Sequence, residues 1–422
     1  MQKKDYFVNI EAENGEVAAM EKTMDFISRY ALGPESVNGA VCLKELLHQM
    51  ELGLSGVGNI PMLPSFLAAD LKPVPGESCC VLDAGGTNLR AAKAEFDAEG
   101  NCRLSAFQKV PMPGTQGEIT AEEFYAQLAS HAAGTGSAER VGLCFSYNVD
   151  MNRELDGVLL AWCKEVRVPD APGKPVGASL KAALGPECRT VRVLNDSTAA
   201  LLGACAQDPE VKLGLILGTG INICYPEKVC RIPKVPQDLR GDAMIISTEI
   251  GEFSGFPKNV FEAAVIAASD DPALAQAEKQ CAGAYLGDVI SGAWQTAAKE
   301  GILDETFLAP AALPTISDFL AGAKTQLPES AAAKEIARTM IHRAARIAAV
   351  LVAGSVLRSC APGTGCKMVI EGSQYTRLTH FGEHFRKELD ALLEPYKIQV
   401  TITQAENACL IGAAVAAFAE SM

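Results

Sequence analysis

Two glycine-containing turns, each between two short apolar runs, constrain the fold of this chain more than any other feature. The first turn lies in LDAGGTNLR at residues 82–90, and the second lies in LGTGIN at residues 217–222. A short apolar run, a glycine turn and a second apolar run are typical of a β-hairpin. Because the pattern restarts without a long sequence repeat, we interpret it as a structural duplication in two related halves.

Both turns have the composition of a phosphate-binding loop. Glycines let the backbone approach an anion closely, and the N–H groups of such a turn can surround phosphate oxygens together with a threonine hydroxyl. Asp83 at a strand end can hold Mg²⁺ through water, and Arg90 can neutralise developing charge. An ordinary hairpin turn is the alternative interpretation. The predicted nucleotide-binding residues are Asp83, Gly85, Gly86, Thr87, Asn88 and Arg90 in the first turn and Gly218, Thr219 and Gly220 in the second.

Motifs of other nucleotide folds are missing from the sequence. There is no GxxxxGK[ST] segment, which excludes the P-loop enzymes. The second turn lacks the third glycine of GxGxxG and precedes a strand, so a Rossmann interpretation is weak. No GxSxG elbow supports a hydrolase. A third glycine, Gly372, ends the short run VIEGS, where it and Ser373 would let a flat base pack on the backbone.

An acidic residue follows the strand predicted over residues 191–194 and begins the helix predicted over 196–205. This residue is Asp196, in the segment LNDSTAALLGA. An aspartate at that position can simply cap the helix. Between two phosphate-binding turns it can instead accept a proton from a substrate hydroxyl, which is the general base that phosphoryl transfer needs.

Hydrophobic periodicity predicts the rest of the architecture. The two sets of hairpins with interleaved helices indicate an α/β protein of two similar halves with a cleft between them. The predicted elements are helices over 17–30 and 41–54, a Gly/Pro-rich connector over 53–75, strands over 141–145, 367–370 and 398–403, and helices within 259–357 and over 407–419.

Length and charge limit the class of protein further. A single hydrophobic core stops growing at roughly 250–300 residues, so 422 residues predict two domains. Hydrophobic residues make up 48% of the chain, which excludes wholesale disorder. A net charge of -14 argues against a nucleic-acid partner, although a local turn can still bind an anionic small ligand.

The 14 cysteines stand mostly in apolar runs, which is typical of buried free thiols in a reducing compartment. Cys360 and Cys366 have no second pair or nearby histidine that would complete a zinc site, and the five histidines match no motif. The N-terminal MQKKDYFVNI has no apolar signal core, and the longest apolar run, 347–357, is shorter than the roughly 18 residues of a membrane span. We therefore expect a cytoplasmic protein with no membrane partner.

The order of the motifs resembles that of the eukaryotic-type hexokinase family. The matching segments are LDAGGTN-LR, FSYN, LAWCKE, LNDSTAALLGA, GLILGTGINICY, STEIGEF, AEKQCAGAYLGDV and IEGS, and they cover roughly residues 78–415. The resemblance implies the two-domain actin-like ATPase (ribonuclease H-like) fold. It also implies a small domain of residues 76–208 plus 405–422, and a large domain of residues 1–75 plus 209–404.

The same resemblance implies an ATP-dependent hexokinase that phosphorylates the 6-hydroxyl of a hexose, with glucose as the first expectation. Asp196 would be the general base, and Lys164 would join it as a catalytic residue. Amides and carboxylates suit a polyol, whose hydroxyls both donate and accept hydrogen bonds. The implied sugar ligands are Ser146, Lys164, Asn195, Asp196, Asn222, Glu249 and Asp288, and the implied cofactors are ATP and Mg²⁺.

The chain departs from the family pattern at several positions near the implied sugar site. These are Tyr147, Asn148, Cys163, Ile250, Asp288 and the shortened segment 407–412. A kinase for fructose or mannose, a sugar-binding regulator without activity, and a non-sugar ATPase of the same superfamily are the alternatives. The sequence does not specify the oligomeric state.

Overall fold

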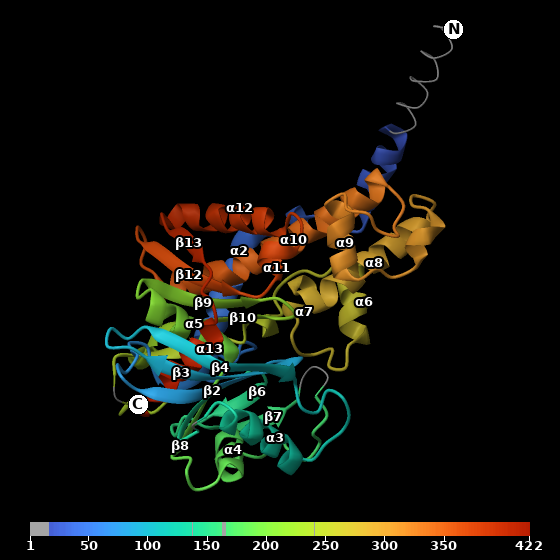
Figure 1. Ribbon diagram of the computed structural model, residues 1–422. Coiled ribbons are helices and arrows are strands. Elements are labelled where there is room, and N and C mark those ends of the chain that lie inside the picture. Colours follow the sequence, from blue (N-terminus) through green and yellow to red (C-terminus); the bar gives the residue numbers. More distant parts are fainter. Residues whose placement is uncertain (1–16, 137, 163–165, 240) are drawn as a thin grey trace, which may run out of the picture.

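The computed structural model describes residues 17–136, 138–162, 166–239 and 241–422. Its core is built from two β-sheets, and two helices lie between them (Figure 1). The first sheet contains the first glycine turn and the second sheet contains the second, so the two predicted hairpins are confirmed. The expected α/β architecture is therefore present.

The first sheet has five strands in the order β4-β3-β2-β5-β8. Helices α3 (Ala121–Ala133) and α4 (Val176–Leu184) pack on one face of it. Thr120 starts α3 with a capping box to Glu123, as the sequence pattern of such a start requires. The strands are β2 (Ser78–Ala84), β3 (Asn88–Phe96), β4 (Cys102–Pro111), β5 (Arg140–Phe145) and β8 (Thr190–Leu194), and a separate hairpin joins β6 (Asn148–Met151) and β7 (Gly157–Ala161).

The second sheet has six strands in the order β1-β11-β10-β9-β12-β13. The long helix α10 (Ala331–Ser359) packs on β9 and β10, and α12 (Phe381–Leu393) packs on α10 (Figure 1). The strands are β1 (Leu63–Ala68), β9 (Val211–Leu217), β10 (Ile221–Lys228), β11 (Ala243–Ser247), β12 (Gly365–Glu371) and β13 (Gln399–Thr403).

Helices α5 (Asp196–Gln207) and α13 (Ala408–Ala416) connect the two sheets. Helix α5 packs on β9 of the second sheet, α13 packs on β2 and β5 of the first, and the two helices pack on each other. At Gly203 and Gly412 any Cβ would overlap a backbone carbonyl of the other helix, of Ala408 and Ala199 respectively. The two helix backbones therefore touch without intervening side chains, which requires glycine at both positions.

The other helical segments pack mainly on α10, on α12 and on one another. Residues 17–29 are also helical. The remaining elements are α2 (Gly39–Leu54), α6 (Val260–Ala268), α7 (Glu278–Cys281), α8 (Gly283–Lys299), α9 (Leu313–Leu320), α11 (Gln374–Arg377) and the 3-10 turns η1 (Pro34–Ser36), η2 (Val229–Arg231), η3 (Ile250–Glu252), η4 (Glu305–Leu308) and η5 (Glu394–Tyr396).

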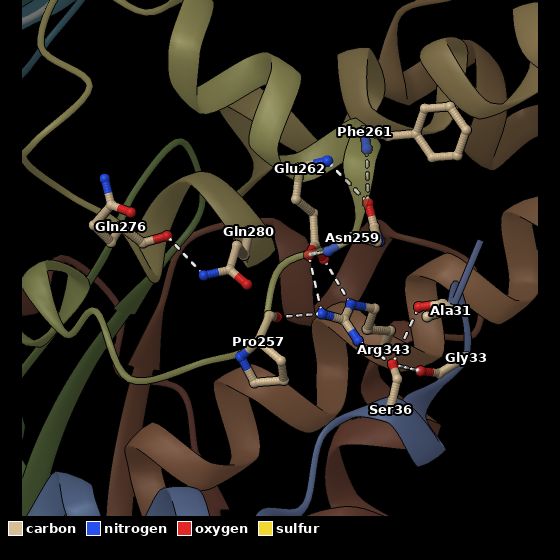
Figure 2. Close-up of polar contacts among 10 residues, drawn as sticks. All are labelled: Ala31, Gly33, Ser36, Pro257, Asn259, Phe261, Glu262, Gln276, Gln280 and Arg343. Atoms are coloured by element: carbon tan, nitrogen blue, oxygen red, sulfur yellow. Dashed lines mark hydrogen bonds and ion pairs between the residues drawn. The ribbon is translucent and has the colours of Figure 1, made fainter. Parts of the chain in front are cut away.

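A buried ion pair and its hydrogen bonds hold η1, α6 and α10 together (Figure 2). Arg343 of α10 donates from Nε and Nη2 to the two carboxylate oxygens of Glu262 in α6, at 2.7 and 3.0 Å. The same guanidinium donates to the Pro257 carbonyl and to the Ser36 hydroxyl of η1. Both charged side chains are only 2% exposed. Removing either partner would leave an unpaired buried charge, so the pair specifies how η1, α6 and α10 meet.

Helix α10 contains the longest apolar run of the sequence. By length and composition α10 could cross a membrane, but 83% of its most apolar window is buried inside the protein. That burial is typical of the central helix of a globular core.

One expected connector is wrong. Residues 53–75 were expected to lack regular structure, yet Leu63–Ala68 forms β1 and pairs antiparallel with β11. The register shifts between Pro64 and Ala68, and Phe66 has a positive φ of 56°, so the strand is irregular and its local pattern is obscured. The division into domains at residues 75, 208 and 404 stays a prediction.

Candidate active site

The first glycine turn carries a buried carboxylate and its cationic partner. Asp83 is 5% exposed near the end of β2, and Arg90 Nε donates to its Oδ2 at 2.6 Å. Gly85 N donates to the Asn88 carbonyl at 3.1 Å, which closes the turn. The Tyr147 hydroxyl donates to the Gly85 carbonyl at 2.7 Å, so this departure from the family pattern supports the turn itself. Asn88 Nδ2 contacts the exposed Thr87 hydroxyl at 2.8 Å.

Residues at α7 and at the start of α8 hold the second turn in place through hydrogen bonds. Gly283 N and Ala284 N, at the start of α8, donate to the carbonyls of Gly218 and Thr219 at 2.8 and 3.1 Å. Glu278 Oε2 accepts from Ile221 N at 3.0 Å. With its carbonyls bonded to α8, the turn is fixed mainly through backbone groups.

The Gly372–Ser373 segment lies directly against the second turn. Gly372 has a φ of 107°, a region that favours glycine, and a Cβ there would overlap the Leu217 carbonyl oxygen. The structure thus brings together the second and third glycine motifs of the sequence, which lie on the adjacent strands β9 and β12.

Asp196 lies at the start of α5, but it is not the residue that caps this helix. Asn195 is the N-cap, and its Oδ1 accepts from Ser197 N at 2.9 Å. Asp196 Oδ1 also accepts from Ser197 N, at 2.8 Å. Because Asn195 fills the capping position, capping alone does not account for a carboxylate at residue 196.

A polar network connects the N-terminus of α5 to the second sheet. Asn222 Nδ2 donates to Ser247 Oγ at 3.0 Å and to Glu249 Oε1 at 2.6 Å. Ser247 Oγ contacts the same Glu249 oxygen at 2.9 Å and the Asn195 Oδ1 at 3.4 Å. Three of the predicted sugar-binding residues, Asn195, Asn222 and Glu249, therefore share one hydrogen-bonded cluster. Ser247 completes it, although sequence reasoning assigned it no role.

Glu249 has an unusual conformation and protonation. Its φ of 53° is left-handed, a strained state for a glutamate. Burial raises the pKa of its carboxyl to about 7, and the hydrogen bond from Ser247 and the negative charge of Asp196 act in opposite directions on it. A carboxyl that titrates near neutral pH among amide and hydroxyl groups is typical of a functional site.

The buried thiol of Cys409 marks where the two halves converge. Its pKa is lowered by a hydrogen bond with Cys144 but raised overall, by burial and by the negative charges of Asp83, Glu371 and Asp196. These three carboxylates therefore lie near enough to the first turn of α13 to influence the Cys409 thiol. Glu371, at the end of β12, was not assigned from the sequence, although it belongs to the IEGS motif. Burial raises the pKa of its carboxyl, and Arg90 opposes that shift.

The remaining predicted ligands lie less centrally. Ser146 follows β5 and its N–H donates to the Ala84 carbonyl at 3.2 Å, next to the first turn. Asp288 is exposed on α8, the helix whose start holds the second turn. Lys164 and Cys163 lie outside the described residues.

The donor set fits one kind of magnesium site. Among the residues described, no group of three histidine, cysteine or acidic side chains could enclose a metal ion. Mg²⁺ does not need such a group, because it keeps several waters and binds one or two carboxylates together with substrate phosphates. Asp83, beside the first glycine turn, fits that arrangement.

Comparison with known proteins agrees with this geometry. Two family models, both described as hexokinase, match residues 25–206 and 212–419. The chain belongs to the hexokinase family. Hexokinases phosphorylate hexoses with ATP, so the family, the enzyme class and the reaction expected from the motifs are confirmed.

Relatives match this hexokinase over most of its length. A hexokinase-2 of Nicotiana tabacum, labelled chloroplastic, is 27% identical over 88% of this chain and 84% of its own. Hexokinase-1 of Saccharomyces cerevisiae is 26% identical over 89% of this chain and 87% of its own. The solved hexokinase of Schistosoma mansoni, complexed with glucose, superposes with a TM-score of 0.83 over 95% of this chain and 99% of its own. At 20% identity that superposition shows the shared fold.

Proposed function

We propose that this hexokinase transfers the γ-phosphoryl group of ATP to the 6-hydroxyl of glucose, with Asp196 as the general base. The observation that carries the proposal is the Asn195–Asn222–Ser247–Glu249 cluster beside Asp196. A hexose presents several hydroxyls that each donate and accept, and this cluster offers amide, hydroxyl and carboxylate groups within one small volume. Glucose is the sugar bound in the Schistosoma mansoni relative.

Two observations support Asp196 as the base. Its carboxylate is partly exposed at the N-terminus of α5, close enough to Glu249 to influence that residue's pKa. The Asp196 carboxylate would accept the proton of the 6-hydroxyl as the oxygen attacks the γ-phosphorus.

The two glycine turns would hold the phosphates, and the Gly372–Ser373 segment would lie against the adenosine. Arg90 would offset the negative charge that grows on the transferring phosphoryl group. Mg²⁺, when bound near Asp83, would supply further neutralisation of the phosphate charge. Exclusion of water from the site would favour transfer to the sugar over hydrolysis.

A reducing, cytoplasmic location is part of the same proposal. The cysteines in the described ranges are all free, and most are buried. Free buried thiols suit a reducing compartment. The location can be checked by fractionating cells that express a tagged chain, and recovery with an oxidising compartment would contradict it.

The test supplies the protein with Mg-ATP and with glucose, mannose or fructose in turn. Turnover is measured as the release of ADP. We expect release that depends on sugar and is greatest with glucose. A greater kcat/KM for another hexose would overturn the glucose assignment and leave the kinase assignment intact. Sugar binding without any turnover would instead support a regulator on this fold.

The role of Asp196 has a matched control on the same helix. Asp196→Asn should lower kcat by about 10²–10⁴-fold, the usual contribution of a general base, while ATP still binds. Asp208→Asn, at the other end of α5 and paired with Lys367, should stay within about twofold of the parent protein. Near-normal turnover of Asp196→Asn would refute the assigned base.

A further inference from the structure

Tyr147 lies where the carboxyl ends of two neighbouring strands meet. Strands β2 and β5 run parallel, and Ala84 is paired with Phe145 at their ends. Ser146 N continues this pairing by donating to the Ala84 carbonyl at 3.2 Å. The next residue is Tyr147, and its hydroxyl donates to the Gly85 carbonyl at 2.7 Å. One side chain therefore joins the segment after β5 to the first glycine turn.

The position of that hydroxyl is fixed by the packing of its ring. Tyr147 is 4% exposed. Its ring centroid lies 4.9 Å from that of Phe145 and 4.9 Å from that of Trp162, which it meets at an angle of 82°. Trp162 packs in turn on Phe124 of α3, with 5.2 Å between centroids, and its Nε1 donates to the Val168 carbonyl at 2.7 Å. Because close-packed rings have few alternative orientations, the hydroxyl has little freedom to move away from the turn.

The hydrogen bond from Tyr147 orients a whole peptide unit of the turn. The Gly85 carbonyl and the Gly86 N–H belong to one planar trans peptide, so they point in opposite directions. Glycine takes positive and negative φ about equally readily, so a peptide between two glycines rotates easily unless one of its groups is held. Tyr147 holds the carbonyl, and the Gly86 N–H is thereby directed to the opposite side of the backbone.

Two backbone hydrogen bonds hold other parts of the same turn. Gly85 N donates to the Asn88 carbonyl at 3.1 Å, and Met112 N donates to the Thr87 carbonyl at 2.9 Å. Neither bond involves the carbonyl of Gly85 or the N–H of Gly86. The Tyr147 hydroxyl therefore adds a constraint on a peptide that these two bonds do not hold.

We propose that Tyr147 is a positioning residue, which preorganises the first turn for phosphate binding by holding the Gly85–Gly86 peptide in one orientation. The proposal rests on the proposed function, since it takes the first turn as a phosphate site. Tyr147 acts through the Gly86 N–H, which donates to a phosphate oxygen. A donor that is already aimed loses less conformational freedom on binding than one that must first be ordered. Tyr147 should therefore affect ligands that carry phosphates and leave other ligands unaffected.

The test measures the Kd of Mg-ATP, of adenosine and of glucose by calorimetry, for the parent protein and for Tyr147→Phe. This substitution removes the hydroxyl and keeps the packed ring. We expect the Kd of Mg-ATP to rise by about three- to tenfold, the usual effect of losing one hydrogen bond. The Kd of adenosine and of glucose should stay within about twofold of the parent values. An equal loss for adenosine or glucose would overturn the proposal, because it would show a general distortion of the site.

Tyr30→Phe is the matched control, because the Tyr30 hydroxyl also donates a hydrogen bond of 2.7 Å. Its acceptor is Glu300, the C-cap of α8, at the opposite end of that helix from the second turn. Tyr30→Phe should bind all three ligands as the parent protein does, and melting temperatures check that both variants are folded.

Two negative results have different meanings. An unchanged Kd of Mg-ATP in Tyr147→Phe would overturn the positioning role and leave the kinase assignment intact. A parent protein that binds no Mg-ATP would overturn the proposed function itself, and the positioning role with it. In turnover assays Tyr147→Phe should raise the KM for Mg-ATP by about three- to tenfold, with the KM for the sugar unchanged.

Discussion

The two glycine turns resemble each other in sequence but are held in different ways. In the first turn a side-chain ion pair, Asp83 with Arg90, lies at the turn, and both charges come from the same hairpin. In the second turn the backbone carbonyls of Gly218 and Thr219 accept hydrogen bonds from the start of α8. Gly372 adds a close backbone contact to this second turn.

The difference indicates a division of roles between the halves. Under the proposed function, the first half would supply fixed charge near the phosphates, so its residues should affect the transition state. The second half would supply shape and, through Asn222 and Glu249, part of the sugar-binding cluster, so its residues should affect stability and affinity. Charge and shape can be changed separately by substitution, which makes the comparison testable.

Between the two turns, the largest expected effect comes from the charge of the first. Asp83→Asn should lower kcat by about 10²–10³-fold, since a preorganised charge near the transferring group is worth roughly 3–4 kcal/mol. The Lys93–Glu95 pair lies on the same hairpin but is solvent-accessible, so Lys93→Ala should change kcat by less than about twofold. Steady-state kinetics of both variants checks this prediction. A kcat for Asp83→Asn close to that of Lys93→Ala would refute the catalytic role assigned to the Asp83 charge.

A medium effect should come from the shape of the second turn. Gly372→Ala forces an unfavourable φ and a clash with the Leu217 carbonyl, so we expect the free energy of unfolding to fall by about 2–4 kcal/mol. Gly301 has a similar positive φ of 70° but open space around it, so Gly301→Ala isolates the backbone strain at about 1–2 kcal/mol. Urea unfolding measures both variants. Equal losses would mean that close packing against the second turn is unimportant.

The smallest effect is a pH dependence of sugar affinity in the second half. Glu249 has a pKa of about 7 before sugar binds, and its carboxylate accepts hydrogen bonds from sugar hydroxyls better than the neutral acid does. Binding should therefore release a proton, so affinity should rise with pH up to about 7 and level off above it. Below that pH the Kd should weaken by up to about tenfold per unit. Calorimetry across this range is the measurement. Glu249→Gln should give a flat profile, and a parent profile equally flat would exclude Glu249 as the titrating ligand.

The sequence predicted the strands that flank glycine turns, because each hairpin is a local pattern. It did not predict β1, whose partner β11 lies far along the chain and whose register is shifted around Pro64. Propensity reflects neighbours in sequence, whereas an irregular edge strand depends on tertiary pairing.

The candidate site, like the fold, could be predicted from the sequence only in part. Asn222 and Glu249 could be named from motifs, but their shared contacts with Ser247 follow from the pairing of β10 with β11. The approach of Glu371 to Arg90 joins residues of different sheets. Motifs list which residues are present, and only the fold shows which of them meet.

The backbone contact between α5 and α13 has a consequence for how the chain folds as it is synthesised. Helix α13 covers a face of the first sheet, whose strands end at residue 194, yet it is made after every strand of the second sheet. The apolar face of the first sheet therefore stays uncovered while about two hundred further residues are synthesised. Such exposure attracts aggregation and chaperones, so we expect nascent chains that stop short of residue 408 to be held by chaperones and those that extend past residue 416 to be released.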